Sequence, residues 1–149
     1  MMRLERLSAS SAHWTETQYD ELFSAVSAPE RLVLVGEDTM YFSGPADALE
    51  SGVAMVGFLV ARHVAAEWEL ENIVVDSMAR NRGLGRQLLN ALLDAARETN
   101  SEEVFLEVRE SNAAARALYE KAGFEHSGWR KAYYNDPSDH AVLYRWKSS

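Results

Sequence analysis

The chain has no cysteine, only three prolines, and fewer basic than acidic residues. The absence of cysteine excludes disulfides, thiolate metal sites and an acyl-cysteine intermediate. No apolar run reaches the roughly 18 residues that a membrane-spanning helix needs, so no membrane partner is expected. No charged-then-apolar leader precedes a small-residue cleavage site either, so a cytoplasmic location is expected. The net charge of −8 argues against nucleic-acid binding and suits a cationic partner, although a solvated acidic surface is the commoner meaning.

The rest of the composition is that of a small globular domain. The 149 residues are 47% hydrophobic, which is enough to bury a core without a second unit, so a single domain over residues 1–149 is predicted. The four histidines show no spacing typical of metal ligands, and no metal site is predicted. They are His13, His63, His126 and His140.

A basic, glycine-containing run is the most informative stretch of the chain. It reads Arg80-Asn81-Arg82-Gly83-Leu84-Gly85, after an apolar strand-like run at 72–76 and before an amphipathic helix expected to begin near Arg86. Main-chain N–H groups at a helix N-terminus, with glycines that let a ligand approach, make an anion site. The spacing differs from the dinucleotide and P-loop patterns. Taken alone, the run is equally compatible with a loop that contains two turn glycines.

A second motif lies downstream, at residues 112–124, and reads N-x-x-A-x-x-L-Y-x-x-x-G-F. In this order, it and the pattern R-x-x-G-x-G at residues 80–85 resemble two blocks of the GCN5-related N-acetyltransferase (GNAT) superfamily. Residues 106–119, with 129–134 beyond them, are most similar to the ribosomal-protein-alanine N-acetyltransferases. The resemblance covers residues 69–144, about half of the chain.

Hydrophobic periodicity predicts an α/β fold. Strands are expected at residues 31–35, 53–64, 68–75, 104–109, 129–134 and 141–146, with a loop or frayed hairpin end at 37–51. Helices are expected near residues 19–26 behind a capping box of Thr15 and Gln18, after Arg86, and at 112–122. Leu84, Leu88, Ala91, Leu92 and Ala95 mark the buried face of the second helix, and Gly123 ends the third. The resemblance implies the same arrangement: a mixed, mostly antiparallel sheet with a central parallel strand–helix–strand crossover, flanked by helices.

The resemblance also implies direct acetyl transfer from acetyl-CoA to an amine. The amine must lose a proton before it attacks, and the departing thiolate needs an acid. Glu107, on the strand face opposite Val104, Leu106 and Val108, is the predicted base, and a solvent-facing glutamate is the alternative. Tyr119 is the predicted acid, with core packing as the alternative.

Residue-by-residue matching to the superfamily implies the cofactor contacts. The pyrophosphate loop is expected at Arg80, Asn81, Arg82, Gly83, Leu84, Gly85 and Arg86, and Asn112 is expected to bind the pantetheine arm. A main-chain N–H of Ile73, Val74 or Val75 is the expected oxyanion donor, freed by a bulge in that strand. Splaying of that strand from the next one is expected to admit the pantetheine arm. Asn112, Arg116 and Tyr119 fall at i, i+4 and i+7 and are expected to face the cofactor together.

Three functions remain open. The chain could acetylate the α-amine of an Ala-initiated ribosomal protein, acetylate a small-molecule amine or a lysine, or bind acyl-CoA without catalysis. Tyr133 and Tyr134 look like the aromatic pair that lines the family's peptide site and favour the first function; hairpin packing is their alternative. Glu107 has no evident charged partner in the sequence, which fits an α-amine (pKa near ~8) better than a lysine (~10.4).

The N-terminal segment departs from the family pattern. Trp14 matches a tryptophan that a strand and a full helix precede in the alanine acetyltransferases, and residues 1–13 are too few for both. Residues 4–7 suffice for a strand only. Residues 14–23 are expected to face the acceptor, so the shortened segment bears on acceptor specificity rather than on cofactor binding.

Overall fold

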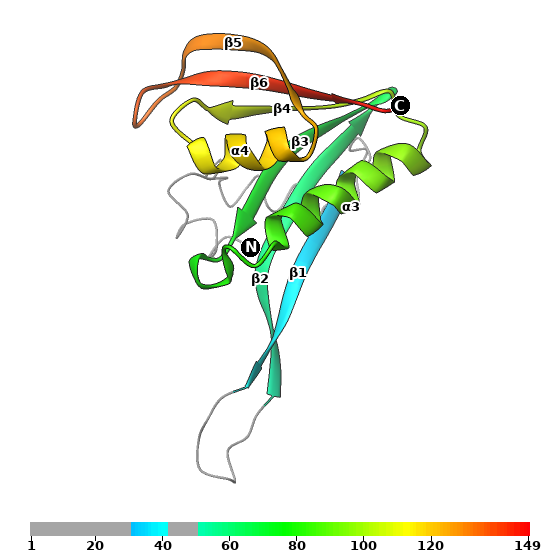
Figure 1. Ribbon diagram of the computed structural model, residues 1–149, viewed down its shortest axis with the longest axis vertical. Helices are drawn as coiled ribbons and strands as arrows, with labels where there is room; N and C mark the ends of the chain where they lie inside the picture. Colours follow the sequence, from blue (N-terminus) through cyan, green and yellow to red (C-terminus); the bar gives the residue numbers. More distant parts are fainter. Residues whose placement is uncertain (1–30, 42–50) are drawn as a thin grey trace.

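The computed structural model describes residues 31–41 and 51–149 (Figure 1). Its elements are β1 (Arg31–Tyr41), β2 (Ser51–Val64), β3 (Glu67–Val75), the 3-10 helix η1 (Ser77–Ala79), α3 (Leu84–Glu98), β4 (Glu103–Arg109), α4 (Ala113–Lys121), β5 (Glu125–Tyr134) and β6 (Asp139–Lys147). The predicted capping box, the helix near residues 19–26 and the strand at 4–7 lie outside the described residues. No helix within the described ranges is long and apolar enough to cross a membrane.

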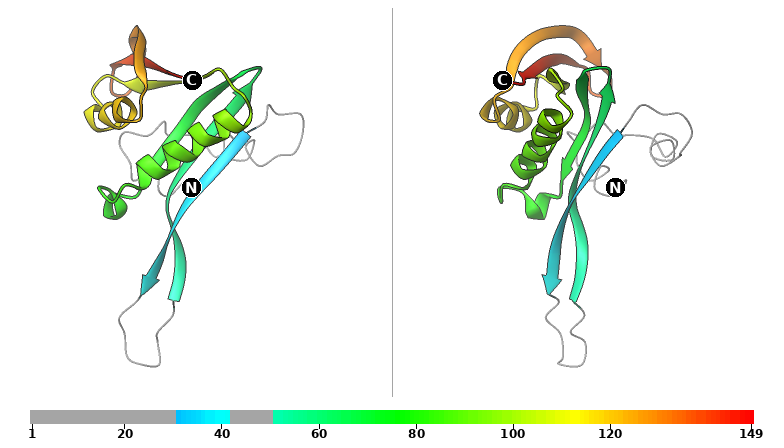
Figure 2. Two further views of the ribbon diagram at one scale, coloured as in Figure 1. Left: turned by 45° about the vertical axis from the view of Figure 1, so that its right-hand side comes forward. Right: turned by 90° about the vertical axis from the view of Figure 1, so that its right-hand side faces the viewer.

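The strands form one six-stranded sheet in the order β1-β2-β3-β4-β6-β5. Neighbours pair antiparallel except for β3 and β4, which are parallel and joined through α3. Helices α3 and α4 lie on the same face of the sheet (Figure 2). The predicted α/β fold class, with its central parallel crossover, is therefore confirmed.

The core lies between this face and the two helices. Residues alternate between buried and half-buried along β3 and β4, so that Leu70 and Leu106 point to the helices while Glu107 points to the other face. Helix α3 buries a wider face than predicted. Leu88 and Leu92 are buried as expected, Ala91 is exposed, and the remaining buried positions of the helix are Leu89, Leu93 and Ala96.

Two element boundaries differ from the prediction. Residues 37–51 were expected to form a loop or a frayed hairpin end. Both ends of this range are strand, because β1 continues to pair antiparallel with β2 through Tyr41 and Ser51. Pairing with a neighbouring strand here outweighs the polar composition that suggested a loop. Helix α3 begins at Leu84 rather than near Arg86, since Gly83 adopts the left-handed conformation (φ 80°) that turns the chain into the helix.

A bulge and an opening interrupt the middle of the sheet. Ala61 pairs with Leu70 and Val60 with Asn72, so Glu71 is an extra residue in β3. The bulge that the resemblance implied is therefore present, but it precedes Ile73–Val75 rather than lying within it. Pairing between β3 and β4 ends at Leu70 and Leu106, and the two strands separate beyond that point.

Candidate active site

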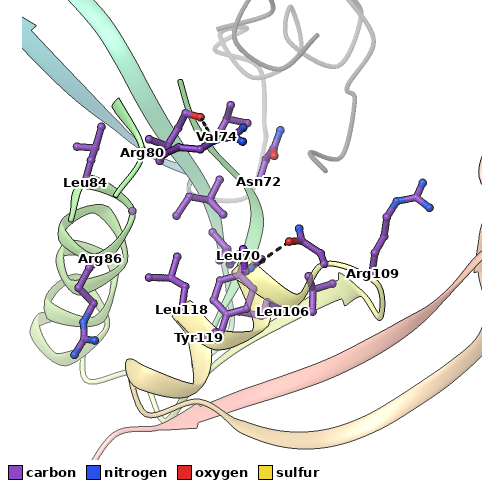
Figure 3. Close-up of a pocket in the computed structure, with 18 of the residues that line it drawn as sticks. Leu70, Asn72, Val74, Arg80, Leu84, Arg86, Leu106, Arg109, Leu118 and Tyr119 are labelled. Atoms are coloured by element: carbon purple, nitrogen blue, oxygen red, sulfur yellow. Dashed lines mark hydrogen bonds between the residues drawn. The ribbon is translucent and has the colours of Figure 1, made fainter. Parts of the chain in front are cut away.

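A cavity of about 960 Å³ opens where β3 and β4 separate (Figure 3). Figure 3 shows Leu84 of α3 on one side of it and Leu118 and Tyr119 of α4 on the other. All but one of the predicted site residues line it: Ile73, Val74, Val75, Arg80, Asn81, Gly83, Leu84, Gly85, Arg86, Glu107, Asn112, Tyr119, Tyr133 and Tyr134. Arg82 is exposed and does not line the cavity. The structure thus brings two distant motifs and the C-terminal hairpin to one place.

The loop between β3 and α3 is a compact turn. Asp76 begins it by accepting a hydrogen bond from the Met78 N–H (2.9 Å), and the Arg80 Nε donates to the Val75 carbonyl (3.1 Å). Asn81 and Gly83 both have positive φ angles, 62° and 80°, which reverse the chain before the helix. Gly83, at the N-cap position, has no side chain with which to cap the first turn of α3. The main-chain N–H groups of that turn are available to an anion in the cavity.

Two strand glycines that the sequence analysis did not single out hold this loop against the sheet. Gly36 and Gly57 pair directly across β1 and β2. A Cβ on Gly36 would lie 2.6 Å from Leu84 Cδ1, and one on Gly57 would lie 2.9 Å from the Val74 carbonyl oxygen. Their missing side chains therefore leave the space into which Leu84 packs, and so fix the start of α3. Glycine inside an otherwise apolar strand was the available signal for such a close approach.

Glu107 has a cationic partner, which corrects the expectation that it has none. The Arg130 Nη2 lies 3.1 Å from Glu107 Oε1, and the Arg130 guanidinium also lies 5.3 Å from the centre of the Tyr133 ring. The charge of the Glu107 carboxylate, helped by partial burial and a hydrogen bond from the Tyr133 hydroxyl, raises the pKa of Tyr133. Glu107, Arg130 and Tyr133 thus form one cluster. The pairing was missed because Arg130 belongs to β5, which reaches β4 only across β6.

Tyr119 is placed both for core packing and for contact with the cavity, which were the two alternatives for it. Its ring packs in the core, with centroids 5.9 Å from Phe124 and 6.2 Å from Tyr144, and it also lines the cavity. Burial, with a smaller contribution from the nearby Tyr134, raises the pKa of Tyr119 far above neutrality. The phenol therefore carries its proton at pH 7.

The predicted face of α4 is only partly correct. The Asn112 side-chain oxygen accepts the Ala115 N–H (3.1 Å) as the N-cap of α4, while the residue still lines the cavity. Arg116 turns away from the cavity. It donates from Nε to the Tyr144 hydroxyl (3.2 Å) and from Nη1 to the Glu110 carbonyl (3.1 Å), and so ties α4 to β6.

Arg109, which sequence reasoning missed, fixes the end of the β5–β6 hairpin. Its guanidinium lies 4.4 Å from the centre of the Tyr134 ring and donates to the carbonyls of Pro137 (2.8 Å) and Asn135 (3.3 Å). Tyr133 and Tyr134 meet edge to face, with ring centroids 5.1 Å apart. Burial and the nearby Glu107 carboxylate raise the pKa of Tyr134 to about 12. Two protonated phenols therefore border the hairpin end of the cavity.

Comparison with known sequences decides the family. Residues 2–124 match the family model described as the Acetyltransferase (GNAT) family. The chain belongs to the GNAT acetyltransferase family. This confirms the resemblance drawn from residues 80–85 and 112–124.

Individual GNAT relatives agree with the assignment. The chain is 44% identical over 91 residues to a ribosomal protein bS18-alanine N-acetyltransferase of Escherichia coli (strain K12), which covers 60% of this chain and 62% of the relative. It is 43% identical over 88 residues to N-alpha-acetyltransferase RimI of Mycobacterium tuberculosis, covering 56% and 54% of the two chains. The aligned segments therefore span less than two thirds of these relatives.

A solved GNAT structure resembles the whole fold. The crystal structure of the ribosomal-protein-S18-alanine N-acetyltransferase from Escherichia coli superposes with a TM-score of 0.73 and 28% identity. The match covers 99% of this chain and 85% of that chain. The likeness in fold thus extends beyond the segment that sequence identity aligns.

Proposed function

We propose that the protein is an acetyl-CoA-dependent N-acetyltransferase that acts on the N-terminal α-amine of an Ala-initiated ribosomal protein. The observation that carries the proposal is the continuity of one cavity. It joins the turn before α3 to Glu107, Tyr119 and the tyrosine pair of the hairpin. The names of the sequence relatives support the choice of acceptor.

Acetyl-CoA fits the end of the cavity formed by the turn. Its pyrophosphate would bind the N–H groups at the start of α3, between Arg80 and Arg86, where the helix dipole also favours an anion. The pantetheine arm would enter where β3 and β4 separate, beside Asn112. The thioester would then lie near Ile73–Val75, where a main-chain N–H can stabilise the oxyanion.

The reaction requires three proton transfers, because two protons leave the nitrogen and one joins the departing sulfur. Glu107, directly or through a water molecule, accepts the proton of the ammonium, and the amine nitrogen then attacks the thioester carbonyl. The tetrahedral oxyanion collapses, the C–S bond breaks, and the nitrogen, now bonded to the acetyl carbon, loses its second proton to solvent. Tyr119 donates its phenolic proton to the departing sulfur, for which its protonated state at neutral pH suits it. A protein that only bound acyl-CoA, without catalysis, would not need both Glu107 and Tyr119 in the same cavity.

The acceptor peptide is assigned to the hairpin end of the cavity, beside Tyr133 and Tyr134. Arg109 holds the turn of this hairpin, so the tyrosines can present a fixed surface. An α-amine, with a pKa near ~8, is partly deprotonated at pH 7, whereas a lysine near ~10.4 is not.

A competition assay tests the acceptor. An Ala-initiated basic peptide that contains one internal lysine is incubated with acetyl-CoA and the protein, together with its N-terminally blocked twin. Mass spectrometry should find acetyl on the free α-amine, with the lysine unmodified in both peptides. Preferential acetylation of the lysine would reject the α-amine, and the same mixture without the protein provides the non-enzymatic background.

A further inference from the structure

Strand β5 contains a wide irregularity beside the candidate active site. Arg130 pairs with Ala141 and Tyr134 pairs with Asp139, so the three residues at 131–133 lie opposite the single residue His140. Ala132, in the middle of this bulge, has a positive φ of 49°. A non-glycine residue in this conformation needs contacts that hold it there.

His140 supplies that contact. Its Nδ1 accepts the main-chain N–H of Ala132 at 2.8 Å, which requires a lone pair on Nδ1. The backbone of His140 is fixed on both sides: its N–H donates to Asp139 Oδ1 (2.8 Å), and its carbonyl accepts the Glu110 N–H (2.9 Å). The backbone that carries the imidazole is therefore held next to the residue that follows β4, and the ring can in turn anchor β5.

The bulge changes which side chains reach Glu107. In a regular strand, Tyr133 would point to the face opposite that of Arg130 and Tyr134. Here Arg130 pairs with Glu107 at 3.1 Å, and Tyr133 also hydrogen-bonds to Glu107. Tyr133 and Tyr134 both line the cavity. Three nearly consecutive side chains thus converge on one site because the extra residues break the alternation.

We propose that His140 is a positioning residue, which fixes the β5 bulge by accepting the Ala132 N–H and so holds Arg130 and Tyr133 on Glu107 in the acceptor site. The inference rests on the proposed function, since it gives the bulge a purpose only if the acceptor binds beside Tyr133. It concerns a side chain that neither lines the cavity nor touches Glu107.

His140 also makes a ring contact, and its effect must be separated from that of the hydrogen bond to Ala132. Its ring also packs against the half-exposed Trp129, with centroids 4.6 Å apart. Two substitutions each remove one of these two contacts and keep the other. His140→Asn places an amide oxygen as many bonds from the backbone as Nδ1 and removes the ring. His140→Phe keeps a ring against Trp129 and removes the hydrogen-bond acceptor.

Steady-state kinetics of the full chain with both substitutions test the proposal. H140F should raise the KM for the acceptor about five-fold, from the loss of this one hydrogen bond, with little change in the acetyl-CoA dissociation constant. H140N should stay within about two-fold of wild type, because it restores the bond. Amide hydrogen exchange at Ala132 should be fast in H140F and slow in the other two proteins.

The outcomes separate this proposal from the proposed function. The acceptor used is whichever one the wild-type protein acetylates among the Ala-initiated peptide, its N-blocked twin and a small primary amine. If the Ala-initiated peptide is not acetylated, the proposed function fails, while the His140 comparison proceeds with another acceptor; with no turnover at all, exchange at Ala132 decides. Unchanged KM and unchanged Ala132 exchange in H140F overturn the proposal, and so does an H140N defect as large as that of H140F.

Discussion

The two ends of the cavity differ in whether main-chain or side-chain atoms form their surface. At the turn before α3, the surface is made by the main chain: the left-handed Asn81 and Gly83 and the uncapped first turn of the helix. At the hairpin, it is made by side chains, chiefly those of Arg109, Tyr133 and Tyr134. A main-chain site is specified by a few adjacent residues, whereas a side-chain site depends on the register of several strands. The first suits a constant cofactor, and the second can change with the acceptor.

The largest effect on turnover is expected from a substitution of Glu107, where the two ends of the cavity meet. Glu107→Gln removes the proposed base while preserving the shape of the side chain, and turnover at pH 7 should fall about 10²-fold or more. Affinity for acetyl-CoA should hardly change, because Glu107 is remote from the turn. Glu103→Gln, on the same strand and face but paired with Arg145 at 2.5 Å, is the control and should keep its turnover. A wild-type rate for E107Q, with chemistry rate-limiting, would show that another group is the base.

Tyr119→Phe should have the next largest effect. The substitution keeps the ring contacts with Phe124 and Tyr144 and removes only the hydroxyl. Loss of a positioned proton donor should lower kcat about ten-fold or more and leave KM little changed. Steady-state kinetics measure both. A raised KM with normal kcat would instead make Tyr119 a binding residue.

The main-chain end can be disturbed alone with Gly85→Val. A Cβ at Gly85 would lie 3.3 Å from Leu118 Cδ2, so the added side chain must occupy the cavity side of the turn. The acetyl-CoA dissociation constant should rise about ten-fold or more, by the loss of hydrogen bonds to charged phosphate. Calorimetry measures it, and circular dichroism checks that the variant is folded. Gly128→Ala, where a Cβ meets Leu143 at an ordinary 3.6 Å, is the control.

The side-chain end can be disturbed alone with Arg109→Gln. The variant loses the bonds to Pro137 and Asn135 and the contact with Tyr134, so the hairpin should lose its fixed position. The acceptor KM should rise about three- to ten-fold, while acetyl-CoA affinity stays unchanged. Arg97→Gln removes a similar cation–π contact, 5.0 Å from the centre of the Trp146 ring but away from the cavity. If both variants raised the acceptor KM equally, the hairpin would have no special role.

The smallest effect concerns Asp139, which follows the turn of the same hairpin. The hydrogen bond from the Ser111 hydroxyl is the main cause that lowers the pKa of the exposed Asp139 below its usual value. A lowered pKa in the folded state means that the stabilisation is present above the unfolded-state value, near ~3.9, and is lost as the pH falls through the folded one. Asp139→Asn should therefore lower the melting temperature slightly at pH 7, and the difference should shrink as the pH falls below the unfolded-state value of ~3.9. A difference that is constant with pH would rule out this ionic contribution.

The sequence predicted what is encoded locally. Helix α4 was placed almost to the residue, because Asn112 caps it and Gly123, with φ 95°, ends it. The turn before α3 was located for the same reason. The pairing of Glu107 with Arg130 could not be predicted, since it depends on the order β4-β6-β5 and on register shifts within β5. The close packing of Leu84 against Gly36 could not be predicted either, because it depends on which strands are neighbours in the sheet.

The early end of pairing between β3 and β4 has a consequence for the free protein. Beyond Leu70 and Leu106, the described part of the sheet has two inward-facing edges, one on β3 and one on β4. Unprotected edges invite strand addition from other molecules and hence aggregation. Here the edges lie inside a cavity walled by α3 and α4, which shields them from an incoming strand while leaving room for a thin, flexible chain. The opening can therefore persist because the helices that bound it also keep an incoming strand from pairing with these edges.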